Sequence, residues 1–150
     1  MIDGVTVTPL EPRVDQRGRW MHLVGADDPD LRPFGEVLLM TVYPGVVRAW
    51  HGHRTRAENL ACIDGMVKAM LYDDRPDSPT RGQVSEVYLG VWSPVRLHVP
   101  PGVYYGLKNI ATGEAVLINV PTAPGKVQDP DELHLPADAP QIPYDWRCEG

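Results

Sequence analysis

The sequence is poor in cysteine and has no long hydrophobic run, and each shortage excludes a class of protein. The two cysteines, Cys62 and Cys148, show neither zinc spacing nor a disulfide framework, so both are expected to be free thiols in a reducing compartment. No apolar stretch approaches the roughly 20 residues that a transmembrane helix needs. The first residues also lack the basic and apolar regions of a signal peptide. We therefore expect a cytoplasmic protein without a membrane partner.

Positive charge is scarce as well. The chain has 14 Lys and Arg against 20 Asp and Glu, a formal net charge of −6, and no basic cluster. Nucleic acids and anionic membrane surfaces are therefore not expected as partners. An acidic total still permits an anionic small-molecule ligand, because a pocket can gather a few arginines.

Turn-forming residues, by contrast, are abundant. Sixteen prolines and 14 glycines interrupt the chain, and no segment shows sustained helical periodicity. Short apolar segments predict strands at 20–25, 36–45, 84–90 and 114–121, and 59–74 predicts a hairpin hinged at Asp64-Gly65. Such spacing predicts one all-β domain, a sandwich or barrel over 1–150, with an extended Pro-rich C-terminal tail from Pro121.

Two motifs place polar residues among these strands. The first, "GVVRAWHGHRTRAENLACIDG" (45–65), carries His51, His53 and Glu58, and the second is "GVWSPVRLHVPPGVYYGLKN" (90–109). Their spacing resembles the paired motifs of the cupin superfamily, whose fold is a double-stranded β-helix (jelly-roll) barrel. Tyr105 stands where cupins usually carry a third histidine.

The chemistry of the first motif leaves two interpretations open. Alternate residues of a strand share a face, so His51 and His53 can both point into a barrel, where Glu58 can join them. Two imidazoles and a carboxylate suit one divalent ion such as Fe, Mn, Ni or Zn, with Tyr105 as a further ligand. The chain would then be a metal-dependent isomerase, lyase or dioxygenase. Otherwise the same side chains are polar groups of a metal-free site.

A narrower resemblance covers most of the chain. "DQRGRW", "GVVRAWH", "DDRPDSPTRG", "VPPGVYYGL" and the ending "IPYDW" resemble dTDP-4-dehydrorhamnose 3,5-epimerases, in particular their short, divergent members. The resemblance implies a cupin homodimer without a metal cofactor. It also implies epimerisation or isomerisation of a nucleotide-linked 4-keto-6-deoxy sugar, by proton abstraction next to the ketone.

The resemblance also implies roles for individual residues. His51 matches the catalytic base, with His53 beside it in the substrate site. Arg48 matches a substrate-binding arginine. Arg17 of "DQRGRW" matches an arginine that contacts the nucleotide diphosphate, for which a guanidinium fork is well suited.

The chain departs from the family at the positions of its lysine and its acid tyrosine. The family's lysine falls at Asn59, which becomes a substrate-binding candidate, and its acid tyrosine falls within "PTAPG" (121–125). Tyr105 is then the candidate acid, facing inward while Tyr104 faces outward. Asp129, before Pro130, is the candidate partner of the base.

A metal-free sugar-nucleotide epimerase is the favoured hypothesis. The metal-dependent cupin enzyme and a non-catalytic sugar-binding cupin are the alternatives. A homodimer is expected in each case, because unpaired edge strands of small barrels favour pairing with a second copy.

Overall fold

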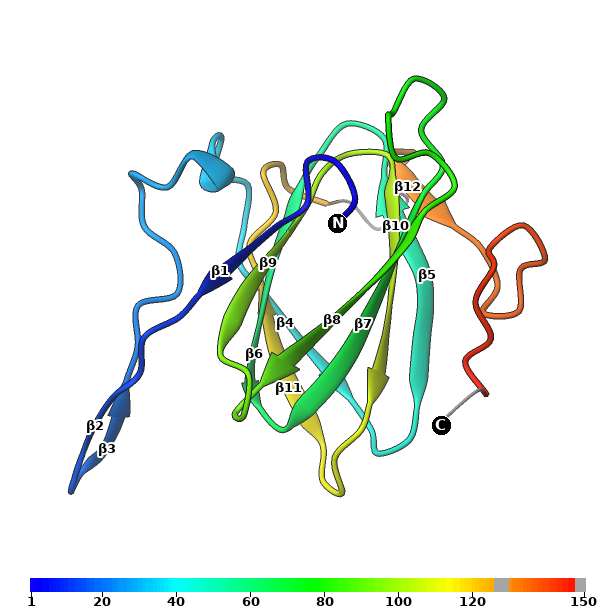
Figure 1. Cartoon of the computed structure of the whole chain (residues 1–150). Helices are drawn as coiled ribbons and strands as arrows, with labels where there is room; N and C mark the ends of the chain where they lie inside the picture. The colour runs from blue at the N-terminus through cyan, green and yellow to red at the C-terminus, as the bar shows by residue number, and fades with distance from the viewer. Residues whose placement is uncertain (126–129, 148–150) are drawn as a thin grey trace.

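Two five-stranded antiparallel sheets face each other in the computed structural model, which describes residues 1–125 and 130–147 (Figure 1). The first sheet has the order β1 (Thr6–Pro9), β9 (Val95–Val99), β6 (Glu58–Asp64), β11 (Ala115–Asn119) and β4 (Leu38–Val42). The second has the order β12 (Glu132–His134), β5 (Val47–His53), β10 (Val103–Asn109), β7 (Met66–Asp73) and β8 (Val84–Gly90). The described residues contain no α-helix, only a 3-10 turn, η1 (Pro29–Leu31), so the all-β prediction is confirmed.

The space between the sheets is filled by every second side chain of the facing strands. Leu60 and Cys62 of β6 point inward with Leu97 of β9, and Leu71 and Leu107 meet them from the other sheet. This is the period-2 alternation that a half-buried strand requires. Burial also raises the pKa of the free Cys62 thiol to about 11, whereas Cys148 lies outside the described residues.

The predicted hairpin over 59–74 is wrong, although its two strands exist. β6 pairs with β9 and β11, whereas β7 pairs with β10 and β8, so the two strands belong to opposite sheets. Gly65, with φ of 79°, reverses the chain between them. A turn signal indicates a reversal but does not determine which strands become hydrogen-bonded neighbours.

The other strand predictions differ in outcome. β4, β8 and β11 fall within the predicted ranges 36–45, 84–90 and 114–121 and are confirmed. The prediction at 20–25 is wrong, because β3 (Gly18–Trp20) ends where that range begins. β3 pairs only with β2 (Arg13–Asp15), and this hairpin projects away from the barrel (Figure 1).

The loop between β7 and β8 is braced by a buried carboxylate. Asp73 accepts hydrogen bonds from Arg75, Ser78 and Thr80, and Arg75 also donates to the Asp3 carbonyl. Burial opposes ionisation of Asp73, but these donors outweigh it and hold its pKa well below the ordinary value. The loop therefore fixes the N-terminus to one end of the barrel.

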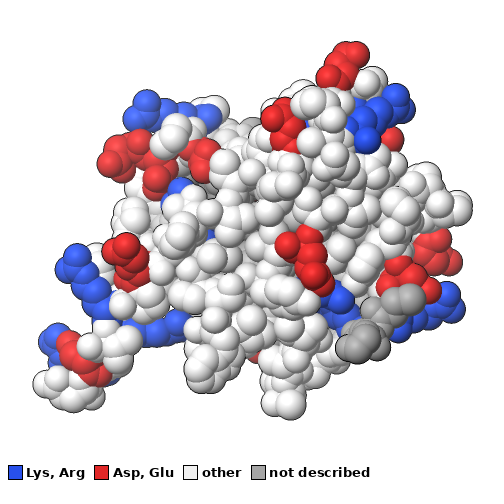
Figure 2. Space-filling model, in the orientation of Figure 1, with Lys and Arg blue, Asp and Glu red and all other residues white. Residues whose placement is uncertain are grey.

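Charged side chains lie mainly on the loops and on the β2–β3 hairpin. Figure 2 shows acidic and basic residues interspersed there, with a largely uncharged surface between them on this face. Neither described range contains a helix of the length and hydrophobicity needed to cross a membrane.

Candidate active site

A β-bulge in β5 brings two functional side chains to one face. Residues three apart on a regular strand point to opposite faces, as Arg48 and His51 would. On the ladder to β10, however, Tyr105 lies opposite His51 and Leu107 lies opposite Arg48, so β5 has one extra residue. Such an insertion re-aims the side chains that follow it. Arg48 and His51 consequently line the same cavity.

This cavity, of about 480 Å³, lies between the ends of the two sheets. Leu38, Leu39 and Met40 of β4 form one apolar part of its lining. Its polar side chains are Thr41, Arg48, His51, His53, Arg56, Glu58, Tyr105, Asn119 and Glu132. Four residues predicted for the site, His51, His53, Arg48 and Tyr105, are therefore brought together.

His51 is half-buried at the edge of the cavity, with a carboxylate behind it. Its Nδ1 lies 3.9 Å from Oε1 of Glu132, which β12 supplies by pairing with β5. Burial is the main cause of a lowered His51 pKa, and the neighbouring His134 and Arg48 lower it further. Glu132 and Glu58 act in the opposite direction. The balance favours a neutral imidazole, which can accept a proton.

His53 and Glu58 form a buried pair deeper in the cavity. Nε2 of His53 lies 2.7 Å from Oε1 of Glu58, and its Nδ1 lies 3.6 Å from Asp131. Burial opposes ionisation of Glu58, but hydrogen bonds from His53 and Tyr105 outweigh it, so the pKa of Glu58 is lowered. Burial and the Glu58 carboxylate raise the pKa of Tyr105 well above its ordinary value. Tyr105 therefore keeps its proton at neutral pH.

Asn59, the predicted substrate-binding residue, is not among the residues that line the cavity. Asn59 follows Glu58 on β6 and therefore points to the opposite face of the sheet. Its Nδ2 donates to the carbonyls of Asp30 and Val120, and its Oδ1 lies 2.9 Å from Nδ1 of His98. Both polar atoms of Asn59 are thus engaged outside the cavity, and the bond to Asp30 holds the η1 segment against the sheet.

Arg17 and Asp129 do not join the cavity either. Arg17 lies in the turn of the projecting β2–β3 hairpin, where its side chain is 83% exposed and pairs with Asp15 at 2.7 Å. Arg17 does not line the His51 cavity of the same chain, so the structure does not support a role for it in binding a diphosphate in that cavity. Asp129 lies outside the described residues.

Three charged residues at the site, Arg56, Asp131 and Glu132, were not predicted. Glu132 and Asp131 approach His51 and His53 because β12 pairs with β5, which places His134 opposite His51 and Glu132 opposite His53. Arg56, also in the cavity lining, has its Nη2 3.3 Å from His53 Nε2. A long-range strand pairing has no local signal in the sequence. Arg56 does have one, because it lies between His53 and Glu58 in the first motif.

The alternative metal set of His51, His53, Glu58 and Tyr105 does not assemble as a ligand group. Within residues 1–125 and 130–147, no three His, Cys, Asp or Glu side chains are arranged to hold a metal ion. His53 and Glu58 are directed at each other, and Tyr105 donates to Glu58. Three of the four residues of the proposed set, His53, Glu58 and Tyr105, are therefore engaged with one another.

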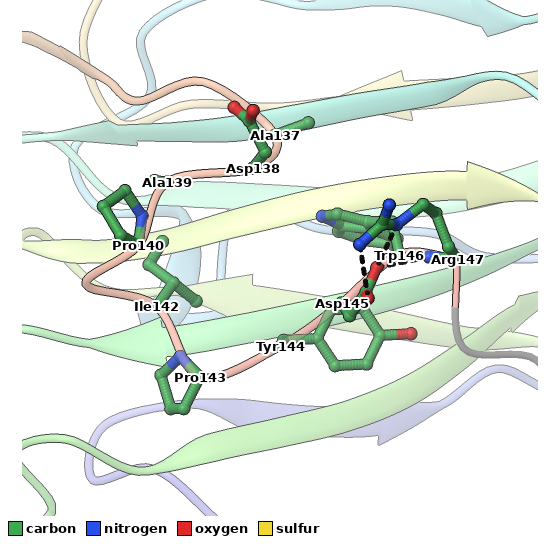
Figure 3. A pocket seen from close by; sticks show the side chains of 10 residues that line it. All are labelled: Ala137, Asp138, Ala139, Pro140, Ile142, Pro143, Tyr144, Asp145, Trp146 and Arg147. Atoms are coloured by element: carbon green, nitrogen blue, oxygen red, sulfur yellow. Dashed lines mark hydrogen bonds and ion pairs between the residues drawn. The ribbon is translucent and has the colours of Figure 1, made fainter.

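A larger hollow, of about 740 Å³, lies elsewhere and lacks this chemistry. It is lined by residues 137–147 of the C-terminal segment (Figure 3). Its charged residues are Asp138, Asp145 and Arg147, of which the last two form an ion pair at 3.0 Å. The smaller cavity at His51 is therefore the candidate active site.

No protein-family model matches the chain, but two curated proteins do. The chain is 36% identical to a probable low-salt glycan biosynthesis epimerase of Haloferax volcanii, over 99% of this chain and 96% of that protein. It is 34% identical to the spore coat polysaccharide biosynthesis protein SpsL of Bacillus subtilis, over 99% of both.

Solved structures show the same fold. A dTDP sugar isomerase from Desulfovibrio desulfuricans superposes with a TM-score of 0.93 at 29% identity, over 99% of this chain and 94% of the other. NovW, a 4-keto-6-deoxy sugar epimerase from Streptomyces spheroides, gives 0.85 at 25% identity, over 98% and 76%. The predicted cupin jelly roll is thus confirmed. The chain belongs to the sugar epimerase family of cupins that resemble dTDP-4-dehydrorhamnose 3,5-epimerases.

Proposed function

We propose that the protein epimerises a nucleotide-linked 4-keto-6-deoxy sugar and that His51 is the base. The observation that carries the proposal is the grouping of a neutral His51, a carboxylate behind it and Arg48 beside it in one cavity. The activities of the related proteins support the sugar-nucleotide substrate class.

The first step uses the acidity of a carbon next to a ketone. Glu132 lies on the Nδ1 side of His51, which leaves Nε2 to take a proton from the carbon beside C4. The C–H bond breaks, and its electron pair forms a carbon–carbon double bond while the carbonyl electrons move onto oxygen. Arg48, as a fixed cation in the cavity, can stabilise the resulting enolate oxygen.

The second step returns a proton to the same carbon from the other face and inverts it. Tyr105 is the candidate donor because it lines the cavity and keeps its proton at neutral pH. The ring centroids of Tyr105 and His51 lie 6.1 Å apart, so the candidate acid and the base are neighbours in the cavity. His51 then releases its proton to solvent and Tyr105 takes one from solvent, so both side chains return to their starting states and no atom or electron is gained overall.

Solvent exchange tests the proposal directly. Incubation with dTDP-4-keto-6-deoxyglucose in D₂O should place deuterium next to the ketone, detected by NMR. A His51→Asn variant should exchange about 10³-fold more slowly, the size of effect expected for loss of a general base. Binding of dTDP, measured by calorimetry, should remain in this variant.

Two results would overturn the proposal. Exchange by the His51→Asn variant at the wild-type rate would exclude His51 as the base. Binding of dTDP by the wild-type protein without exchange of this sugar would favour a non-catalytic sugar-binding cupin.

We also propose a homodimer in which the β2–β3 hairpin of one copy reaches the other. The hairpin projects from its own barrel and exposes Trp20, at 63%, together with Arg17 (Figure 1). The edge strand β4, which lines the cavity, exposes Leu39 at 66% and pairs on one side only. Exposed apolar residues on an open edge favour association.

Complementation tests the dimer. Arg17→Ala and His51→Asn subunits, each nearly inactive alone, should recover activity when mixed, because one of the two cavities in a mixed dimer is then intact. A monomer by light scattering, or no recovery on mixing, would contradict the arrangement.

A further inference from the structure

The ending "IPYDW" takes no part in the chemistry described above, yet it packs directly behind the β5 bulge. We propose that Trp146 and the segment around it clamp this bulge from outside the barrel, which makes Trp146 a positioning residue for Arg48 and His51. The kinetic part of its test rests on the proposed function.

The bulge leaves two consecutive residues on the outer face. Ala49 and Trp50 lie between Arg48 and His51. Both pack in a separate cluster of apolar side chains, on the side of the sheet away from the cavity. Trp50 is fully buried there. Any movement of the Trp50 backbone must move His51, because the two residues are adjacent.

The C-terminal segment holds Trp50 by its backbone and its ring. The Trp50 amide donates to the Leu135 carbonyl at 2.8 Å, and the Leu135 amide donates to the Trp50 carbonyl at 3.1 Å. The indole Nε1 of Trp50 donates to the Ala137 carbonyl at 3.3 Å. The same segment, through β12, supplies Glu132 to His51.

Trp146 adds a further contact between the C-terminal segment and Trp50, because the two rings pack in one aromatic cluster with Tyr144. Its ring centroid lies 5.2 Å from that of Trp50 and 4.9 Å from that of Tyr144, the latter edge to face. Figure 3 shows Tyr144 and Trp146 on the segment that crosses the strands. Lys68 of β7 donates to the Trp146 carbonyl at 3.5 Å, which fixes the segment to the sheet.

The strand opposite the bulge is shaped for Trp146. Gly106 of β10 lies between Tyr105 and Leu107, the positions where the ladder shifts. A Cβ at this position would lie 2.5 Å from Cζ2 of Trp146 and 2.7 Å from Cβ of Ala49. The missing side chain therefore lets the indole and the bulge meet over the same residue.

Two substitutions test the clamp from opposite sides. Trp146→Leu removes the indole. Gly106→Ala adds a methyl group that forces the indole of Trp146 away from Ala49. Neither Trp146 nor Gly106 lines the cavity. In each variant kcat should fall about tenfold or more, because small displacements of a positioned group have effects of this order. Trp146→Phe should restore part of the loss.

NMR supplies a readout that does not depend on the reaction. The ring signals of His51 and the guanidinium signals of Arg48 should shift in both variants. Leu89→Val, a core substitution on β8 remote from the bulge, is the control for a general loss of stability. It should lower the melting temperature while leaving kcat and these signals unchanged.

The outcomes separate the two proposals. If folded Trp146→Leu and Gly106→Ala proteins keep the wild-type kcat and the His51 signals, Trp146 serves only stability and the inference is overturned. If the wild-type protein lacks the proposed activity but the signals shift as expected, the proposed function fails and the clamp stands.

Discussion

Nε2 of His53 lies 2.7 Å from Oε1 of Glu58, inside the barrel where both side chains are almost closed to solvent. Each group supplies the polar partner that the other needs, since a buried charge without one is costly. Tyr105 donates to the same carboxylate. The pair thus organises the cavity floor, whereas His51 stands at its edge, where a substrate can reach it.

This pairing leads to a prediction about Glu58 and metal. Glu58→Gln should lower activity less than about tenfold, because the base is elsewhere, and should lower the free energy of unfolding by about 2 kcal/mol through weakened buried hydrogen bonds. Kinetics, urea denaturation and elemental analysis of tag-free protein check these points. We expect far less than one metal ion per chain. A stoichiometric metal that is lost in His53→Ala, together with an inactive Glu58→Gln, would restore the metal-dependent alternative.

A second prediction concerns pH. Burial lowers the His51 pKa, so kcat/KM should fall on the acid side only below the ordinary imidazole value of about 6.5. Because the unfolded chain binds this proton more tightly, His51 should also decrease stability as the pH falls from that value through the lowered pKa.

Two variants of β12 should move the acid limb of the pH profile, the fall of kcat/KM at low pH, in opposite directions. Glu132→Gln removes a charge that stabilises the imidazolium, so the limb should shift to lower pH. His134→Gln removes a group that opposes a second positive charge, so the limb should shift to higher pH. The pH dependence of kcat/KM in the two variants measures both shifts. Shifts of the same sign, or none, would exclude His51 as the titrating group.

The sequence was informative where function depends on local spacing. Alternation along one strand was sufficient to predict that His51 and His53 share a face, whereas the resemblance to cupins was needed to choose Tyr105 over Tyr104 as the inward residue. The spacing of strands predicted an all-β sandwich or barrel, and the resemblance of the two motifs to those of cupins implied the jelly roll. Arg48 reached the cavity only through a bulge, which no periodicity contains, and the family resemblance supplied it instead.

Long-range pairing explains what the sequence could not provide. β6 and β7 are consecutive but lie in different sheets, because each pairs with strands remote in the chain. Glu132 reaches His51 through β12 in the same way. Arg17 lies on a hairpin that projects from the barrel, and the residues around it carry no signal of where that hairpin lies relative to the cavity.

The hydrogen bonds of Asn59 outside the cavity lead to the third prediction. Asn59→Ala would leave the buried Val120 carbonyl, the partly buried Asp30 carbonyl and the Nδ1 of His98 without their present partner. The free energy of unfolding should fall by about 2 kcal/mol, as expected when buried polar groups lose hydrogen bonds. Activity of the folded variant should stay within about twofold of the wild-type value, because the side chain faces away from the cavity.

Asn119 provides the matched control, since the same residue type lines the cavity on β11. Asn119→Ala should change KM for the sugar nucleotide, which Asn59→Ala should not. Urea denaturation and steady-state kinetics at one temperature, with both variants folded, compare the two effects. A tenfold loss of kcat/KM in Asn59→Ala would return this residue to the substrate site, and the η1 segment above it would then have to open during turnover. With activity retained, the position of the family's lysine has become a structural one in this chain, and the enolate must be held by Arg48 or another cation of the cavity.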